Sequence, residues 1–135
     1  MKKREFNKIL NKMILLIESQ SNSDFAIKEE LTFIKEQIKK AKIKNSDHKC
    51  NNKYVYFCNK RLAGCRPISI SHISIIVEDI NQNIPFGFVL HCRDGFMYAL
   101  EVYSCDLQSF SKVLLKNIDF KYLSGSFRTS HESYR

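Results

Sequence analysis

Four side chains between residues 48 and 65 are of the types that bind zinc. His48, Cys50, Cys58 and Cys65 would together supply one imidazole and three thiolates, a donor set that suits a tetrahedral zinc ion. Their spacing is irregular, however, and the sequence contains no C-x2-C pair of the kind that marks structural zinc sites. We therefore predict that the chain uses no metal and no other cofactor, with this zinc set as the one alternative.

The cysteines are also candidates for nucleophilic catalysis, which needs a thiolate activated by a nearby base. Cys92 directly follows His91, but neighbours on a strand point to opposite faces, so this pair does not suit the reaction. Two other pairings, His72 with Cys65 and His91 with Cys58, stay open because the sequence does not set their separation. No nucleophile motif surrounds any of these residues, which favours a protein that is not an enzyme.

Carboxylates and glycines add no catalytic pattern. Glu78 and Asp79 are adjacent in a polar stretch, and a glycosidase-like acid–base pair would need a separation that the sequence does not define. Glu101 lies in an expected strand, where it is either a structural hydrogen-bond acceptor or an exposed residue. The four glycines are scattered, and neither nucleotide-binding fingerprint is present. A small enzyme with an unrecognised site is therefore only the third candidate function.

Basic residues are concentrated in the N-terminal half of the chain. Residues 1–60 hold 14 Lys and Arg against 7 Asp and Glu, whereas residues 61–135 hold 8 against 7. Four lysines occupy one face of an expected helix: Lys28, Lys35, Lys39 and Lys42. Tyr54, Tyr56 and Phe57 also lie near Lys60 and Arg61, and nucleic-acid sites combine aromatic with basic residues. These features make a nucleic-acid-binding module the alternative function. A lysine face is also typical of a solvated helix surface, and aromatic residues are also typical of a core.

The elements that must position these residues begin with two helices. From about residue 5 to 19, and again from about 25 to 42, apolar residues recur at spacings of three and four, as on one face of an amphipathic helix. Residues 22–24 interrupt the pattern and supply helix-capping side chains. We expect an antiparallel helical pair within residues 4–43.

Strands are expected in residues 53–105. The runs 54–58 and 68–77 are rich in aromatic and β-branched residues, which favour strands. The polar residues 44–52 are predicted to be a linker, and residues 59–67 a basic loop. Residues 106–117 are predicted to form a short helix and residues 124–135 a flexible tail.

The clearest local pattern is the Asp94-Gly95 pair between two apolar runs. A two-residue type I′ turn needs positive φ at both central positions, and Asp-Gly is among the residue pairs that adopt it most readily. The sequence therefore predicts a β-hairpin. Its expected register pairs Arg93 with Phe96, Cys92 with Met97, His91 with Tyr98, Leu90 with Ala99 and Phe88 with Glu101.

Helices followed by strands predict an α+β fold, with an N-terminal helical pair packed on one face of a small antiparallel sheet. The expected single domain spans residues 1–123. Five irregularly spaced cysteines do not suit a disulfide framework, and the sequence shows no apolar run of membrane-spanning length and no signal-peptide pattern. We therefore expect a cytoplasmic protein.

The hairpin resembles one found in small uncharacterised bacterial α+β proteins. Residues 88–95 (FVLHCRDG) and 98–103 (YALEVY) are similar to their V-x-L-H-x-x-x-G-x-L-x-E-L-E line, although Ala99 replaces one acidic position. The resemblance covers about residues 86–110 and implies a small bacterial cytosolic protein. By analogy at the level of the fold, it also implies an immunity-type role.

These observations together predict a non-enzymatic binding protein, of immunity or regulatory type, that binds and neutralises a partner protein such as a toxin or effector. Aromatic and basic side chains dominate interface hot spots. The predicted partner-binding residues are Arg61, Arg66, His91, Arg93 and Tyr98. The lysine face of the second helix is the predicted contact for the alternative partner, nucleic acid. The oligomeric state is left open.

Overall fold

The computed structural model describes residues 3–20, 25–49, 52–58, 62, 64–79, 85–104 and 120–129. Their elements are two helices, α1 (Lys3–Gln20) and α2 (Phe25–Lys40), and six strands, β1 (Ile43–Lys49), β2 (Asn52–Phe57), β3 (Ile70–Asp79), β4 (Pro85–Arg93), β5 (Phe96–Ser104) and β6 (Phe120–Thr129). Neither helix is sufficiently long and apolar to cross a membrane.

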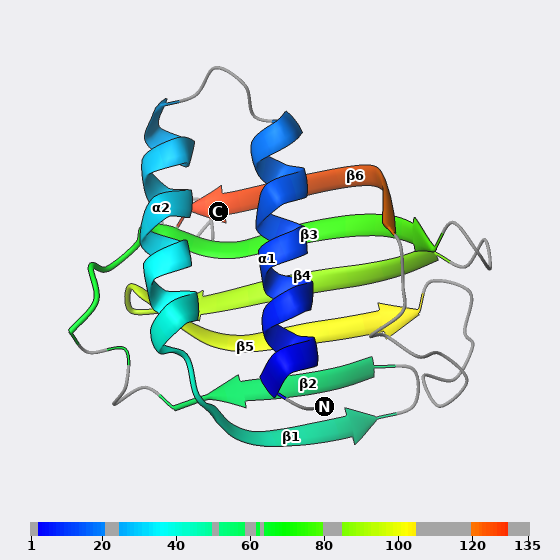
Figure 1. Cartoon of the computed structure of the whole chain (residues 1–135), viewed down its shortest axis with the longest axis horizontal. Coiled ribbons are helices and arrows are strands. Elements are labelled where there is room, and N and C mark those ends of the chain that lie inside the picture. The colour runs from blue at the N-terminus through cyan, green and yellow to red at the C-terminus, as the bar shows by residue number, and fades with distance from the viewer. Residues whose placement is uncertain are drawn as a thin grey trace.

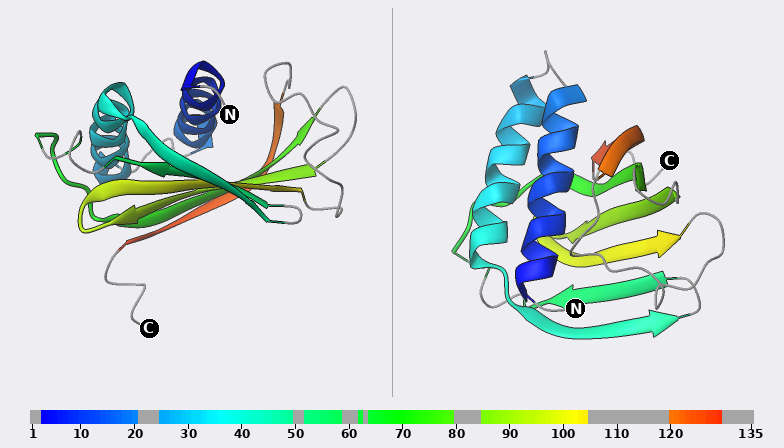
Figure 2. Two further views of the ribbon diagram at one scale, coloured as in Figure 1. Left: turned by 90° about the horizontal axis from the view of Figure 1, so that it is seen from below. Right: turned by 45° about the vertical axis from the view of Figure 1, so that its right-hand side comes forward.

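The helices and the sheet form two layers. The six strands are antiparallel and lie in the order β1-β2-β5-β4-β3-β6. Both helices run across the strands on the same side of the sheet (Figures 1 and 2). No element of the described residues lies on the other side, which we call the open face. The predicted α+β fold, with the helical pair on one face of an antiparallel sheet, is confirmed.

The core lies between the helices and the inner face of the sheet. The apolar stripe of each helix is buried, as Ile14 of α1 and Ile34 of α2 show, both with no exposed surface. The sheet contributes inward-facing residues to the same core, such as Phe86, Phe88 and Leu90 of β4, each at most 1% exposed. Val89 and His91, which alternate with these residues on the same strand, are half-buried on the other side of the sheet. Burial of the inner set therefore determines which side chains reach the open face.

Among the described residues one polar side chain is buried with the core, that of Gln37 on α2. Its Nε2 donates to the backbone carbonyls of Arg66 and Gly95 at 3.0 Å each, and its Oε1 accepts from the backbone N–H of Met97 at 2.9 Å. The Gly95 carbonyl also accepts from the Ile68 N–H at 2.9 Å. Gln37 therefore joins α2 to both the hairpin turn and the segment that precedes β3.

The hairpin forms at the predicted turn, but its register changes after two pairs. Asp94 and Gly95 have φ values of 54° and 92°, as a type I′ turn requires. Arg93 pairs with Phe96, and Cys92 pairs with Met97, as predicted. A β-bulge then leaves Tyr98 as an extra residue. The later predicted pairs are wrong by one position: the structure pairs His91 with Ala99, Leu90 with Leu100 and Val89 with Glu101.

The bulge has a simple cause in the pattern of burial along β5. Met97, Leu100 and Val102 are all completely buried, yet 97 and 100 differ by an odd number of residues and would face opposite sides of a regular strand. The extra residue at Tyr98 corrects this parity. Without it, Glu101 would share the face of Met97 and would point towards the helices.

Two predictions outside the central strands are wrong. Residues 44–52 are not a linker, since most of them belong to β1 and the start of β2. The predicted tail at 124–135 is a strand as far as Thr129, so the sheet spans residues 43–129 rather than 53–105. Both missed strands are edges of the sheet, where polar residues and a glycine are tolerated because one side of the strand is unpaired. The predicted helix at 106–117 lies outside the described residues.

Candidate functional site

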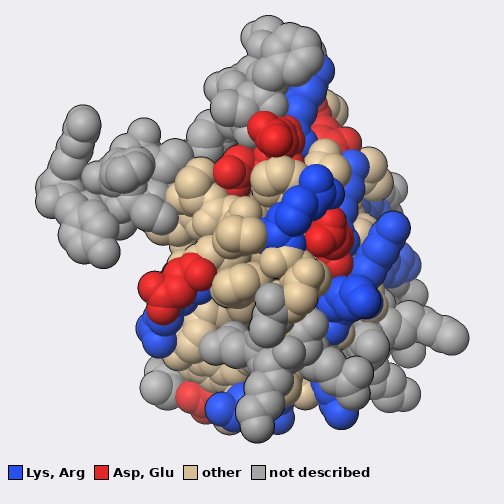
Figure 3. Space-filling view, turned by 90° about the vertical axis from the view of Figure 1, so that its left-hand side faces the viewer, with Lys and Arg blue, Asp and Glu red and all other residues tan. Residues whose placement is uncertain are grey.

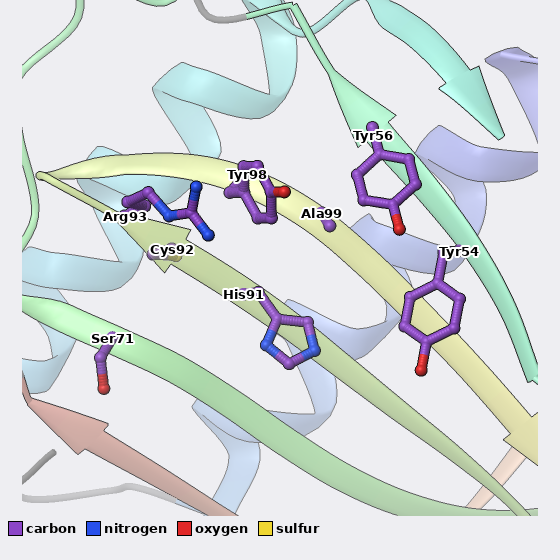
Figure 4. A pocket seen from close by; sticks show the side chains of 8 residues that line it. All are labelled: Tyr54, Tyr56, Ser71, His91, Cys92, Arg93, Tyr98 and Ala99. Carbon is purple, nitrogen blue, oxygen red and sulfur yellow. The ribbon is translucent and has the colours of Figure 1, made fainter. Parts of the chain in front are cut away.

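The open face carries a shallow hollow of about 310 Å³. Four neighbouring strands, β2, β5, β4 and β3, supply the residues that line it (Figure 4). The lining residues are Tyr54, Tyr56, Ser71, His91, Cys92, Arg93, Tyr98 and Ala99.

A small residue between large ones explains why the face is hollow here. Ala99 of β5 lies directly opposite Tyr56 of β2 on one side and His91 of β4 on the other. Residues that face each other in neighbouring strands project on the same side of a sheet. The methyl group of Ala99 therefore leaves a floor between a phenol ring and an imidazole ring, and Tyr98, displaced by the bulge, adjoins it.

One end of the hollow is organised around the carboxylate of Glu101. Its Oε2 accepts hydrogen bonds from Asn52 Nδ2 at 2.9 Å and from the hydroxyl of Tyr54 at 3.2 Å. Its Oε1 lies 3.1 Å from His91 Nε2, which donates when that nitrogen carries the proton. The carboxyl side chain is 17% exposed and that of His91 is 39% exposed. Glu101 therefore fixes the imidazole at the edge of the hollow while its own charge is covered by donors.

The other end consists of stacked rings and one guanidinium group. The guanidinium carbon of Arg93 lies 4.0 Å from the centroid of the Tyr98 ring, a cation–π contact. Tyr98 meets Tyr56 edge to face, with centroids 5.8 Å apart, and Tyr56 stacks against Tyr54 at 6.3 Å. The three tyrosines thus form a continuous aromatic wall that ends at Arg93.

Three of the five predicted partner-binding residues come together in this hollow: His91, Arg93 and Tyr98. Arg66 does not join them. It bonds to Glu36 of α2, with Nη2–Oε2 and Nε–Oε2 distances of 2.8 and 3.1 Å, and its guanidinium covers the ring of Phe33 at 4.2 Å. Hydrogen bonds from the side chain and backbone of Arg66 hold the pKa of Glu36 below its usual value. Arg61 lies outside the described residues.

The lysine face predicted for the second helix is part of a surface of mixed charge. Lys28, Lys39 and Lys42 are exposed, but Lys35 forms an ion pair with Glu18 of α1. Acidic side chains lie among the basic ones on this side of the molecule (Figure 3). The structure therefore shows no uninterrupted basic stripe along the described part of α2.

The cysteines are the remaining chemical candidates. Cys92 packs against the core, and burial, aided by the negative charge of Glu30, raises the pKa of its thiol to about 12. Cys58 and Cys65 are free thiols. No group of three metal-binding side chains occurs among the described residues, and the structure does not describe Cys50 or the side chain of His48. Two of the four side chains of the predicted zinc set therefore lie outside the described part of the structure.

The most connected residue of the site, Glu101, was not among the predicted contacts. The sequence allows Glu101 to be either a hydrogen-bond acceptor or an exposed residue, and the structure shows it to be an acceptor. Alternation of tyrosines at 54 and 56 was the only sequence signal that these two rings share a face. Asn52 carried no signal, because it lay in the predicted linker.

Comparison of this chain with protein-family models, curated proteins and solved structures finds no match. The residues of the open face are therefore the basis for a functional assignment.

Proposed function

We propose that this protein is a non-enzymatic binding protein whose open sheet face binds and neutralises a partner protein, in the manner of an immunity protein. The observation that carries the proposal is the hollow itself. It brings Arg93, His91 and three tyrosines together on a face that no described element covers. Arginine and tyrosine, with tryptophan, are enriched among the residues that carry most of the binding energy near the centre of protein interfaces.

The rigidity of the face also supports binding. Strand residues present side chains from a hydrogen-bonded scaffold, and the contacts of Arg93 with Tyr98 and of His91 with Glu101 restrict these side chains further. Side chains that are ordered before association lose less entropy on binding. A preorganised face of this kind suits a tight inhibitor of another protein.

The thiol closest in sequence to His91 gives no support to catalysis. Cys92 faces the core, and a pKa of about 12 leaves almost no thiolate at neutral pH. The imidazole and the thiol therefore lie on opposite sides of β4, as neighbours on a strand do.

The test is an affinity pull-down from a lysate of the source cell with the full chain, after nuclease treatment, at low and high salt. Matched columns carry the double variant Arg93→Ala/Tyr98→Ala on the open face and Lys39→Ala on exposed α2. We expect one protein that the wild type and Lys39→Ala retain at high salt and the double variant loses. Retention of the same protein by all three columns would contradict a role for the open face.

One observation favours the alternative partner, nucleic acid. Tyr54, Tyr56 and Tyr98 share the open face of a sheet in a chain of net charge +8, and unpaired bases stack on such rings. Binding of a phosphate backbone weakens steeply with salt, whereas a packed protein interface weakens less. Recovery of nuclease-sensitive material that elutes at high salt would therefore favour this alternative.

A further inference from the structure

Arg93 differs from two other cations at the surface of this protein, Arg66 and Lys35. Arg66 is bound to Glu36, and Lys35 is bound to Glu18. Arg93 has no ion-pair partner among the described residues, and its guanidinium packs on the ring of Tyr98. The carboxylate of the site, Glu101, is already engaged by three donors on β2 and β4.

The stacked position of Arg93 leaves its hydrogen-bonding groups available. A guanidinium donates in its own plane, so a ring beneath its flat face does not compete for the N–H groups. The residue is exposed, and it stands at the rim of the hollow beside Tyr98 (Figure 4). This arrangement matches a carboxylate, which accepts two parallel N–H bonds from one guanidinium.

The hollow beside Arg93 offers apolar contact. Tyr56 and Tyr98 meet edge to face, and Ala99 lies opposite Tyr56 as the floor. A volume of about 310 Å³ is at the small end of the range of ligand pockets and holds one or two side chains. A group that enters there with an aromatic or aliphatic body meets the rings of Tyr56 and Tyr98 and the methyl group of Ala99.

We propose that the hollow binds an acidic segment of the partner protein, with the carboxylate of an Asp or Glu on Arg93 and a neighbouring aromatic or aliphatic side chain over Ala99, against the rings of Tyr56 and Tyr98. This inference rests on the proposed function and names the chemistry of its partner. A single guanidinium balances the single charge of a carboxylate, and the net charge of +8 on the chain favours an acidic partner.

The test uses the full chain, labelled with ¹⁵N, and two dipeptide probes. Acetyl-Asp-Phe-amide carries the carboxylate, and acetyl-Asn-Phe-amide has nearly the same shape without the charge. We expect the acidic probe to shift the amide resonances of Arg93, Tyr98 and Ala99, and to bind about tenfold more tightly than the neutral probe, because charge-assisted hydrogen bonds are about twice as strong as neutral ones. Equal affinity for the two probes, or shifts confined to other surfaces, would overturn the inference.

Two variants that remove one positive charge each provide the control. Arg93→Gln should abolish the preference for the acidic probe, whereas Lys39→Gln, on the exposed side of α2, should retain it. Stronger binding of inorganic phosphate than of the acidic probe would assign the hollow to a phosphate-bearing ligand and would also overturn the inference. If neither probe binds while the pull-down still yields a partner that depends on the open face, the proposed function stands and the acidic segment is wrong.

Discussion

The two faces of the sheet are built from the same strands and are held in different ways. On β4, the inner residues Phe86, Phe88 and Leu90 are packed against the helices and are almost completely buried. The alternate residues His91 and Arg93 are half-buried or exposed, and each is held by a single contact with a side chain of β5. The inner face is ordered by exclusion of water, whereas the open face is ordered by specific polar and aromatic contacts.

This difference predicts that the inner face determines stability and that the open face determines binding. Burial of a large apolar side chain contributes more to folding than a polar contact that water can replace. Changes on the inner face should therefore unfold the protein, and changes on the open face should leave it folded but alter what it binds. Substitutions of Gln37 and Gly95, which join α2 to the hairpin turn, should have intermediate effects on the free energy of unfolding.

The largest expected effect is on the inner face. Phe88→Ala removes a ring that is 1% exposed and should lower the free energy of unfolding by about 3–5 kcal/mol. Its neighbour Val89, on the opposite side of β4, provides the matched control, and Val89→Ala should cost about 1 kcal/mol or less. Urea denaturation of both variants measures the contrast, and similar losses for the two would remove the distinction between the faces.

Gln37→Leu should have the next largest effect. The Met97 N–H, which is buried, and the Arg66 carbonyl lose the hydrogen bonds that Gln37 makes with them. The Gly95 carbonyl retains its bond from Ile68. An unsatisfied buried group costs about 1–3 kcal/mol, so we expect a loss of about 2–3 kcal/mol. Thr32→Leu on the exposed part of α2 is the control, and thermal unfolding of both variants is measured. If Gln37→Leu lowers the melting temperature no more than Thr32→Leu does, Gln37 does not fix the hairpin.

Gly95→Ala should cost less than the loss of Gln37. The φ of 92° disfavours a side chain, and an added Cβ would lie 2.7 Å from the Cβ of Pro67. We expect a loss of about 1–2 kcal/mol in the free energy of unfolding. Gly64→Ala is the matched change, since a Cβ there meets nothing within 4 Å, and it should be close to neutral. Chemical denaturation distinguishes the two, and a neutral Gly95→Ala would contradict the close packing of the turn.

The smallest effect on folding is expected from Glu101→Gln on the open face. The partly exposed contact with His91 contributes little to stability, so the free energy of unfolding should change by about 1 kcal/mol or less. Retention of the partner in the pull-down should fall, because His91 loses the carboxylate that orients it. Unfolding and retention are measured on the same preparation. A variant that loses stability but binds normally would reverse the assignment of the two faces.

Local patterns in the sequence were enough to predict the helices, the central strands and the turn. The three- and four-residue spacing of apolar side chains predicted α1 and α2 to within a few residues, because one face of each helix must be buried. The Asp94-Gly95 turn was predictable because positive φ is a property of these two residues and not of their surroundings.

The tertiary structure decided the rest. The edge strands β1 and β6 form because β2 and β3 offer unpaired backbone groups, which their own polar sequences do not reveal. The bulge at Tyr98 follows from the burial of Met97 and Leu100 together, and it is what turns Glu101 towards the open face. Glu101 then meets Tyr54 only because β5 pairs with β2 across 47 residues of sequence. Sequence periodicity reports which side of an element is buried, whereas the partners of a strand are decided by the burial and hydrogen bonding of the whole sheet.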